Sequence, residues 1–249
     1  MKNYYGNFEE SSYYHVMIRG IAKQIIFEEI SDNKYFLKIL ESFSKKYNIS
    51  IICYCLMINH VHIECQDFDD NLSAFMCNLC STYARYFNKK YDRCGALFQR
   101  PYNKKLIKNE GYLLQVYHYI IKNPENEGIC PYEKYTWSSY KYYFSENHFT
   151  NSNIIKEILG SQSLDSYLQT QIEANNEIQY KSFKNDKITD NQALELVKTQ
   201  YNLKTTTNVK SFDKEKRKEI ILFLKTHGLS VRQIERVTGI SRGIIQNIV

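Results

Sequence analysis

The sequence of 249 residues lacks any apolar run long enough to cross a membrane. A membrane-spanning helix needs about 20 largely apolar residues in succession, and no such run occurs. The start, Met1 to Gly6, also lacks the apolar segment of a secretory signal peptide. We therefore expect a cytoplasmic protein with no membrane partner.

The sequence also lacks the cysteine pairs of a complete zinc site. Its seven cysteines are an odd number, and we expect them to stay reduced in the cytoplasm. Cys77 and Cys80 have the spacing of half a zinc site, but no second close pair or histidine follows at ligand spacing. Because both fall in a helical pattern, we interpret them as core thiols.

Charge and aromatic content indicate the class of partner. The 33 Lys and Arg against 27 Asp and Glu leave a net charge of +6, which favours a polyanionic partner without requiring one. The 22 tyrosines, interleaved with basic residues, suit base stacking on single-stranded nucleic acid. An A·T-rich genome also raises the tyrosine content, so composition alone leaves the partner open.

The most informative stretch is a histidine–valine–histidine triplet that follows the largely apolar residues 50–58. Side chains alternate between the faces of a strand, so His60 and His62 should share one face while Val61 enters the core. Their backbones would lie about 6.6 Å apart, close enough for both imidazoles to bind one metal ion. Glu64 shares that face but lies roughly 13 Å from His60, which makes it a poor third ligand.

Periodicity predicts an α+β fold. We expect a first strand at 13–20, a helix at 33–47 and two strands within 50–64, broken by a turn near Ile58. A second helix follows at 72–86, then a loop at 97–107 that runs into a last strand, and then a third helix at 112–122. The order strand, helix, two strands, helix, strand is typical of a ferredoxin-like fold with an antiparallel sheet. The additional third helix must pack against that sheet.

The third helix brings two polar side chains together. Tyr119 and Asn123 are four residues apart, so they should lie on one helix face about 5–6 Å from each other. If that face meets the histidine strand, a phenol and an amide oxygen reach the metal region, and a tyrosine beside a metal-bound phosphate forms a nucleophile–electrophile pair. On the residues alone the simpler interpretation is favoured, in which Tyr119 is a core aromatic and Asn123 a helix cap.

Five motifs stand in a particular order and spacing between residues 13 and 143. They are His15-Val16 with Arg19-Gly20, Met57 with Asn59-His60-Val61-His62, Gly95 with Leu97-Phe98-Gln99-Arg100, Tyr119-Ile120 with Asn123-Pro124, and Trp137-Ser138-Ser139-Tyr140. Together they resemble the single-tyrosine HUH transposases, most closely the REP-associated tyrosine transposases. Ile58 stands where that family usually has proline, a change that affects a turn rather than a ligand.

The resemblance implies a metal-dependent DNA endonuclease and strand transferase. In that family the two histidines and the polar residue four after the tyrosine hold a divalent ion, and the tyrosine attacks DNA. These roles would fall to His60, His62, Asn123 and Tyr119, and cleavage would leave a 5′-phosphotyrosine and a free 3′-OH. The resemblance implies Mg²⁺ or Mn²⁺, and two imidazoles suit Mn²⁺ better.

The implied substrate is single-stranded DNA at the foot of an imperfect hairpin, so we expect the protein to be associated with the nucleoid. Basic side chains are expected to hold the DNA backbone. In the catalytic domain these are Arg19, Lys89, Lys90, Arg93, Arg100, Lys104 and Lys105. The oligomeric state is left open between monomer and homodimer.

The last 42 residues, 208–249, predict a helix-turn-helix for duplex DNA. We expect helices at 213–227, 231–237 and 242–249, with Ser230 and Ser241 as N-caps and Gly239 in the turn. The expected core is Ile234, Val237, Ile240, Ile244 and Ile248, and the expected exposed basic residues are Arg232, Arg236 and Arg242. A three-helix appendage for protein contacts is the alternative.

The sequence therefore divides into three predicted segments. Residues 1–145 form an HUH single-tyrosine transposase domain, 146–207 a polar, all-α connector and 208–249 the helix-turn-helix. Two other functions stay open. A non-catalytic DNA-binding regulator would work through the helix-turn-helix, and a rolling-circle replication initiator or relaxase would share the chemistry with differently spaced motifs.

Overall fold

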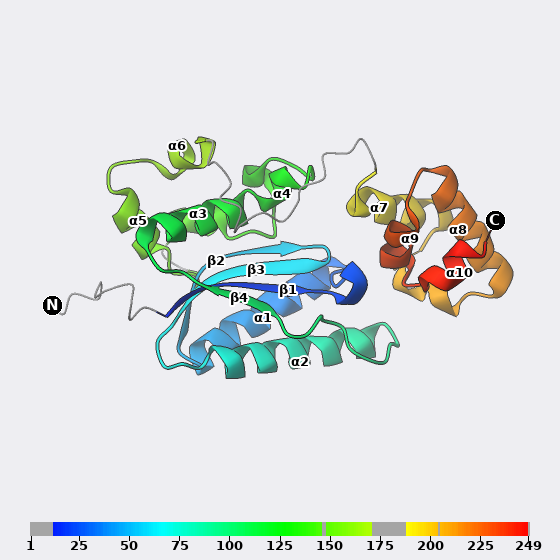
Figure 1. The fold of residues 1–249 in the computed structure, drawn as a ribbon, viewed down its shortest axis with the longest axis horizontal. Helices are drawn as coiled ribbons and strands as arrows, with labels where there is room; N and C mark the ends of the chain where they lie inside the picture. Colours follow the sequence, from blue (N-terminus) through cyan, green and yellow to red (C-terminus); the bar gives the residue numbers. More distant parts are fainter. Residues whose placement is uncertain (1–11, 146–147, 171–187, 204, 249) are drawn as a thin grey trace.

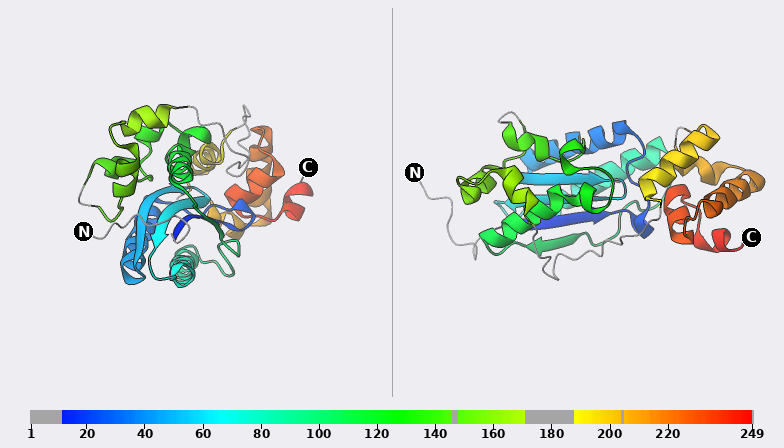
Figure 2. Two further views of the ribbon diagram at one scale, coloured as in Figure 1. Left: turned by 60° about the vertical axis from the view of Figure 1, so that its left-hand side comes forward. Right: turned by 90° about the horizontal axis from the view of Figure 1, so that it is seen from above.

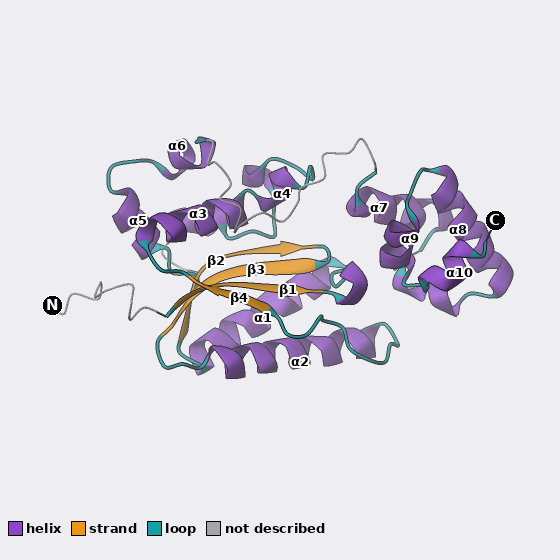
Figure 3. Ribbon diagram, in the orientation of Figure 1, coloured by secondary structure: helices purple, strands orange, loops and turns teal. Residues whose placement is uncertain are grey.

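The structure is a computed structural model that describes residues 12–145, 148–170, 188–203 and 205–248. Its centre is a four-stranded sheet in the order β2-β3-β1-β4 (Figures 1 and 3). The strands are β1 (Tyr13–Arg19), β2 (Ile49–Met57), β3 (His60–Asp67) and β4 (Asn103–Leu106). All neighbouring strands are antiparallel, which confirms the predicted α+β class with an antiparallel sheet.

Helices cover both faces of this sheet (Figures 1 and 2). On one face lie α1 (Ile30–Lys46) and α2 (Leu72–Lys90), and on the other lies α3 (Glu110–Ile121). Along β3, Val61 and Ile63 are fully buried in the core under α1 and α2. The intervening side chains therefore point toward α3. None of the described helices is long and apolar enough to cross a membrane.

The expected break in the histidine run is a two-residue turn between β2 and β3. The carbonyl oxygen of Ile58 accepts a hydrogen bond from the Ile26 amide at 2.9 Å, and that of Asn59 accepts one from the Gly20 amide at 2.9 Å. The loop after β1 thus holds the turn, and β3 begins directly after it at His60.

Gly20 is needed in that loop because the chain folds back closely on itself. A Cβ atom at this position would lie 2.3 Å from the carbonyl oxygen of Gln24, closer than any side chain can approach. This accounts for the glycine that follows Arg19 at the end of β1.

The two cysteines of α2 are less buried than the sequence predicts. Cys77 is exposed and Cys80 is partly buried, so the interpretation of Cys77 as a core thiol is wrong. The apolar residues at three- and four-residue spacing, among them Phe75, Leu79 and Tyr83, take up the inward face instead.

Short helical segments complete the catalytic domain. They are η1 (Ile21–Lys23), α4 (Asn123–Asn126), η2 (Tyr132–Lys134), η3 (Tyr140–Phe144), α5 (Asn153–Leu159) and α6 (Leu164–Gln169). Ile155 of α5 and Leu168 of α6 are fully buried in the same core as α3. The first part of the expected connector therefore packs on the catalytic domain, whereas residues 171–187 lie outside the described part of the chain.

A second bundle lies at one end of the sheet (Figures 1 and 2). It contains α7 (Asp190–Tyr201), η4 (Thr207–Ser211), α8 (Lys214–Thr226), α9 (Val231–Thr238) and α10 (Arg242–Gln246). Ala193 and Val197 of α7 share its core with Ile220 and Ile234. The end of the expected connector thus belongs to this bundle.

The predicted core of the bundle is correct at Ile234, Val237 and Ile240, which are buried. It is wrong at Ile244, which is 46% exposed, while Ile245 is fully buried. Successive helix residues differ in direction by about 100°, so a shift of one position in α10 exchanges an inward side chain for an outward one.

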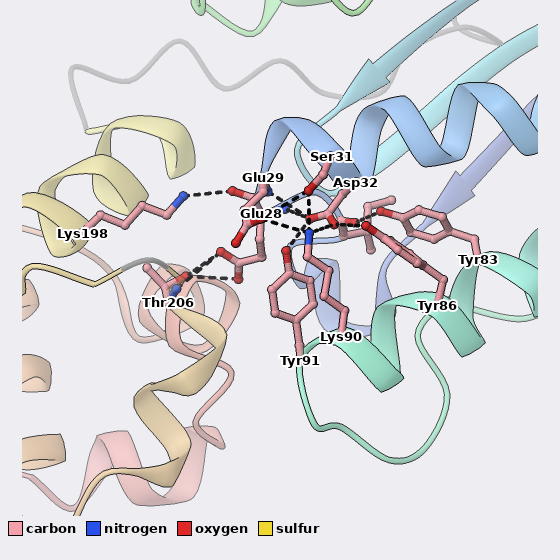
Figure 4. A network of polar contacts seen from close by, with 11 residues as sticks. Glu28, Glu29, Ser31, Asp32, Tyr83, Tyr86, Lys90, Tyr91, Lys198 and Thr206 are labelled. Carbon is pink, nitrogen blue, oxygen red and sulfur yellow. Dashed lines mark hydrogen bonds and ion pairs between the residues drawn. The ribbon is translucent and has the colours of Figure 1, made fainter.

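The buried carboxylate of Asp32 ties the start of α1 to α2 (Figure 4). It is 0% exposed. Its five donors are the amides of Glu28 and Glu29 at 2.9 Å each, the hydroxyls of Tyr86 and Tyr91 at 3.0 and 2.6 Å, and Lys90 Nζ at 2.6 Å. Multiple hydrogen bonds and an ion pair offset the cost of burying this charge.

The same corner holds the C-terminal bundle against the catalytic domain (Figure 4). Thr206 donates its hydroxyl and its amide to the Glu28 carboxylate, at 3.3 and 3.4 Å. Lys198 Nζ donates to the Glu28 carbonyl oxygen at 2.9 Å. Both Glu28 and Thr206 are buried, so the bundle is docked through desolvated polar contacts.

We expect Asp32→Ala to lower the free energy of unfolding by about 3–5 kcal/mol, as for the loss of one partner of a buried ion pair. Two tyrosine hydroxyls would lose their acceptor, and the Lys90 ammonium would keep only Glu29 and Ser31 among the described contacts. Urea unfolding of the full chain measures this change. Asp69→Ala is the control, because exposed Asp69 accepts only from Asn48 among the described contacts, and it should cost less than about 1 kcal/mol. Equal losses in the two variants would contradict the role given to Asp32.

Candidate active site

Three polar side chains of β3 point toward α3, on the face opposite the α1 and α2 core. His60, His62 and Glu64 are 5%, 0% and 0% exposed. The imidazole centroids of His60 and His62 are 5.0 Å apart, with their planes nearly perpendicular. The two rings are close enough to bind one ion, as the alternation of the strand predicts.

Burial keeps both imidazoles neutral. It lowers the pKa of His60 to about 3 and the pKa of His62 well below its ordinary value. Arg19, which stands opposite His60 across β1 and β3, adds to both effects through its positive charge. Neutral imidazole is the form that offers a lone pair to a metal ion.

Each imidazole is held through its Nδ1 atom. His60 Nδ1 lies 2.7 Å from Oδ1 of Asn59, and His62 Nδ1 lies 3.0 Å from Nε2 of His15. An amide oxygen only accepts hydrogen bonds, so His60 Nδ1 carries the proton and its lone pair is on Nε2. Metal-binding histidines are commonly held in this way through the other ring nitrogen.

The last turn of α3 carries Tyr119, and α4 begins at Asn123. The Tyr119 ring is perpendicular to that of His62, with the centroids 5.3 Å apart. Asn123 is 3% exposed, and its side chain is near enough to His60 to favour the protonated imidazole, against the larger effect of burial on the pKa. As predicted, α3 stops before Pro124, at Ile121.

The side-chain oxygen of Asn123 is a buried acceptor. Within the described residues, no donor reaches Asn123 Oδ1 at ordinary hydrogen-bond distance and angle. A buried acceptor without a donor costs about 1–3 kcal/mol, and a cation at this atom would remove that cost. The described chain has no cluster of three His, Cys, Asp or Glu side chains able to hold a metal ion. The imidazoles of His60 and His62 and the amide oxygen of Asn123 could hold such an ion together.

Neighbouring tyrosines of α3 are less suited to attack a substrate. Tyr117 is 1% exposed, and burial raises its pKa well above 10. Tyr112 precedes Tyr119 by seven residues, about 10 Å along the helix. Tyr119 is the one that contacts the rings of both His15 and His62.

Glu64 takes no part in this set. Burial raises its pKa well above the ordinary value, and Cys53 Sγ lies 3.4 Å from its Oε2. It stands opposite His15 in the β1 and β3 ladder, one repeat beyond His62. This agrees with the expectation that Glu64 is a poor third ligand.

The basic residues expected at DNA divide into two groups. Lys89, Arg100, Lys104 and Lys105 are exposed. On β4, Lys105 stands opposite His15, and its charge contributes to lowering the pKa of that histidine. The alternation of the strand turns Lys104 to the other face, where its Nζ lies 5.7 Å from the Tyr14 ring centroid.

The remaining basic residues of this domain make contacts within the protein, and their expected role at DNA stays a prediction. Lys90 pairs with Asp32 at 2.6 Å, and Arg93 Nη2 donates to Gln24 Oε1 at 2.7 Å. The acceptors are Asp32 in the first turn of α1 and Gln24 in the loop before it. Arg19 is half-buried, with Nη2 at 3.7 Å from the sulfur of Met17.

In the C-terminal bundle, Arg232 is exposed as expected, whereas the prediction of exposure is wrong for Arg236. Its guanidinium donates twice to Asp190, at 2.5 and 2.6 Å, and its side chain is 15% exposed. Asp190 comes from α7, which packs on α9. Arg242 pairs with Glu235 at 2.6 Å and keeps 49% of its side chain exposed.

The sequence did not predict the roles of two residues that contact the histidines of the triplet. His15 and Asn59 belong to the recognised motifs, but only the structure shows them on the Nδ1 atoms of His62 and His60. Strand alternation places His15 on the same face as Arg19, and this pattern could have predicted that His15 faces the site. The register between β1 and β3, which brings His15 to His62, is not readable from the sequence.

Comparison with known proteins identifies the domain. Residues 9–123 match the model of the family described as "Transposase IS200 like". The chain is similar to a REP-associated tyrosine transposase bound to a REP hairpin, at 13% identity and a TM-score of 0.45, over 52% of this chain and 75% of that one. It is also similar to a candidate transposase from Deinococcus radiodurans R1, at 17% identity and a TM-score of 0.34, over 44% and 88%. Comparison with curated proteins gave no match.

The family match extends from before β1 to Asn123. It therefore includes the sheet, both histidines of the triplet and Tyr119. IS200-like transposases are tyrosine HUH nucleases that cleave DNA, and members generally use a divalent metal ion. Over residues 9–123 the chain matches the IS200-like transposase family.

Proposed function

We propose that this transposase cleaves single-stranded DNA with Tyr119 as the nucleophile, beside a divalent ion held by His60, His62 and Asn123. One observation supports this most directly. The end of α3 sets the Tyr119 ring 5.3 Å from the His62 ring, and the start of α4 buries Asn123 beside His60. The phenol and the amide are thus fixed relative to both imidazoles.

The side chains suit a divalent ion of the Mg²⁺ or Mn²⁺ kind. The amide oxygen suits either ion, and two neutral imidazoles favour Mn²⁺. A bound ion supplies Lewis acidity, which draws negative charge from a non-bridging phosphate oxygen. Asn59 would keep the His60 imidazole oriented through its Nδ1 atom.

Tyr119 supplies the attacking oxygen. An ordinary tyrosine has a pKa near 10, so only about one in a thousand is ionised at pH 7, and the phenol must lose its proton as it attacks. Its oxygen bonds to phosphorus, the bond from phosphorus to the 3′ oxygen breaks, and that oxygen takes up a proton. The products are a 5′-phosphotyrosine and a free 3′-OH. Attack by another 3′-OH on the phosphotyrosine reverses these steps without ATP and joins the strands.

The substrate we propose is single-stranded DNA at the foot of a hairpin. Arg100, Lys104 and Lys105 are exposed and can hold its phosphates. Lys105 is next to His15 in the sheet, so the edge strand β4 carries positive charge directly beside the site. A strand passing along β4 would reach Tyr119.

We further propose that α9 and α10 form a helix-turn-helix for duplex DNA. Ser230 caps α9 by accepting from the Gln233 amide. Gly239 ends that helix in the left-handed region, at φ +66°, where glycine is favoured. Arg232 is exposed and Arg242 half-exposed, so two cations are available for phosphate and base contacts.

Tyr119→Phe should abolish covalent attachment to DNA, because the variant lacks the attacking oxygen. A labelled single-stranded hairpin incubated with wild-type protein and Mn²⁺ should give a labelled adduct in denaturing gels. Tyr117→Phe is the matched control and should retain it, because Tyr117 is buried in the core. An adduct with Tyr119→Phe would reject the assignment. A wild-type protein that binds DNA without an adduct would favour a non-catalytic regulator.

Asn123→Ala should weaken Mn²⁺ binding at least about tenfold, since losing even an outer contact of a metal site costs 10–100-fold. His60→Ala should do the same. Mn²⁺ titration followed by electron paramagnetic resonance measures the affinity. Asn78→Ala, which removes an exposed amide on α2, should bind Mn²⁺ like the wild type. Unchanged affinity in Asn123→Ala would remove Asn123 from the ligand set.

Arg232→Ala should weaken duplex binding and reduce the slope of log affinity against log salt by about 0.9, the value for one phosphate contact. Lys45→Ala is the control, because its side chain is 70% exposed on α1, and it should leave the slope unchanged. Arg236→Ala should instead destabilise the bundle by breaking the pair with Asp190. If Arg232→Ala and Lys45→Ala gave the same slope, α9 would not be part of the duplex contact.

A further inference from the structure

His15 makes a contact whose geometry is more specific than packing requires. It lies on β1, is 7% exposed, and its Nε2 is 3.0 Å from Nδ1 of His62. The two rings stack with their centroids 5.2 Å apart and a plane angle of 30°. In the ladder His15 stands opposite Glu64 and Met17 opposite His62, so the contact is a diagonal one across the strands.

A nitrogen–nitrogen contact of this length needs one proton between the two atoms, so two arrangements of neutral rings are possible. If His15 Nε2 donates, then His62 Nδ1 accepts and the His62 proton is on Nε2, which cannot bind a metal ion. If His62 Nδ1 donates, then His15 Nε2 accepts and the lone pair of His62 is on Nε2. Only the second arrangement leaves His62 able to act as a ligand through Nε2.

We infer that His15 is a positioning residue, which accepts the Nδ1 proton of His62 and so fixes the tautomer and ring orientation in which His62 Nε2 binds the metal ion. This inference rests on the proposed function, in which His62 is a ligand. His15 itself binds neither metal nor DNA. Its contribution is the acceptor atom and the ring stacked on His62.

The partner of the other histidine supports this arrangement. Asn59 Oδ1 accepts from Nδ1 of His60 at 2.7 Å, and that oxygen cannot donate. With His15 as an acceptor, both imidazoles carry their proton on Nδ1 and present Nε2 to the ion. One ring is thus set by an amide from the turn before β3, and the other by an imidazole from the neighbouring strand.

His15 also forms part of the wall beside the nucleophile. Its ring lies 6.0 Å from that of Tyr119, nearly edge-on. A simple packing role would depend on this ring, whereas the positioning role depends on the acceptor nitrogen. Two substitutions separate these roles. His15→Phe keeps a ring and removes the acceptor, and His15→Gln removes the ring and keeps an acceptor oxygen within reach of His62.

The experiment compares the full-length wild type, His15→Phe and His15→Gln. Mn²⁺ affinity is measured by electron paramagnetic resonance, and thermal unfolding reports folding. The tautomer of His62 is measured without metal, from long-range ¹H–¹⁵N couplings of ¹⁵N-histidine-labelled protein, with the signal assigned by its loss in His62→Ala. His148→Phe is the matched control, because His148 stacks on Tyr142 away from β3.

We expect His15→Phe to weaken Mn²⁺ binding about 10–100-fold, the usual effect of losing an outer contact of a metal site. His15→Gln should stay within a few-fold of the wild type, and His148→Phe should be unchanged. The wild type and His15→Gln should show the proton of His62 on Nδ1. Cleavage should follow Mn²⁺ affinity, with His15→Phe recovering at high Mn²⁺ concentration.

Two results would overturn the positioning role. One is a wild-type protein whose His62 carries its proton on Nε2, and the other is equal Mn²⁺ affinity in His15→Phe and in a wild type that binds Mn²⁺ more tightly than His62→Ala. Failure of the proposed function looks different, because the wild type and His62→Ala would then bind Mn²⁺ equally weakly while the tautomer measurement still decides the role of His15. If His15→Phe fails to fold, the positioning role is tested by His15→Gln and by the tautomer of His62 in the wild type. In that case, a loss of Mn²⁺ binding in folded His15→Gln rejects the inference.

Discussion

The site depends on the burial of one face of β3. Val61, Ile63 and Cys65 are fully buried in the core under α1 and α2, and this fixes which side chains face α3. A slip of one residue would turn every side chain of the strand to the opposite face, taking His60 and His62 into the apolar core. The hydrophobic core therefore determines the face of the sheet to which both imidazoles point. The hydrogen-bond partners of the rings then orient each ring on that face.

What the sequence predicts correctly follows from local periodicity. The alternation at His60 and His62 needs only the geometry of one strand. Tyr119 and Asn123 lie at the end of α3 and the start of α4, and their joint role at a metal ion stays a prediction. Contacts between residues far apart in the sequence could not be predicted, because they depend on how separate elements pair. His15 and His62 are separated by 47 positions, and their meeting depends on a strand register that periodicity does not encode.

The exposure of the basic residues is also only partly predictable, because the sequence does not show which acidic residue lies next to each basic one in the fold. Arg236 was expected to be exposed, but Asp190, 46 positions earlier, pairs with it. Lys104 and Lys105 remain exposed on β4, an edge strand of the sheet. Lysines on an edge strand also discourage pairing with another sheet. Their exposure therefore has a structural use in addition to the proposed contact with DNA, and only the loss of DNA binding in a variant separates the two.

The docking of the C-terminal bundle and the placement of His60 depend on one short loop, residues 20–29. Glu28 accepts from Thr206 of the bundle, while the Glu28 amide donates to Asp32. Two residues earlier, the Ile26 amide holds the turn that precedes His60. The loop is thus fixed at both ends by buried hydrogen bonds. The distance between the bundle and the histidines is therefore set by this fixed loop. If α9 and α10 bind duplex DNA as proposed, the loop also fixes the separation of that duplex from Tyr119.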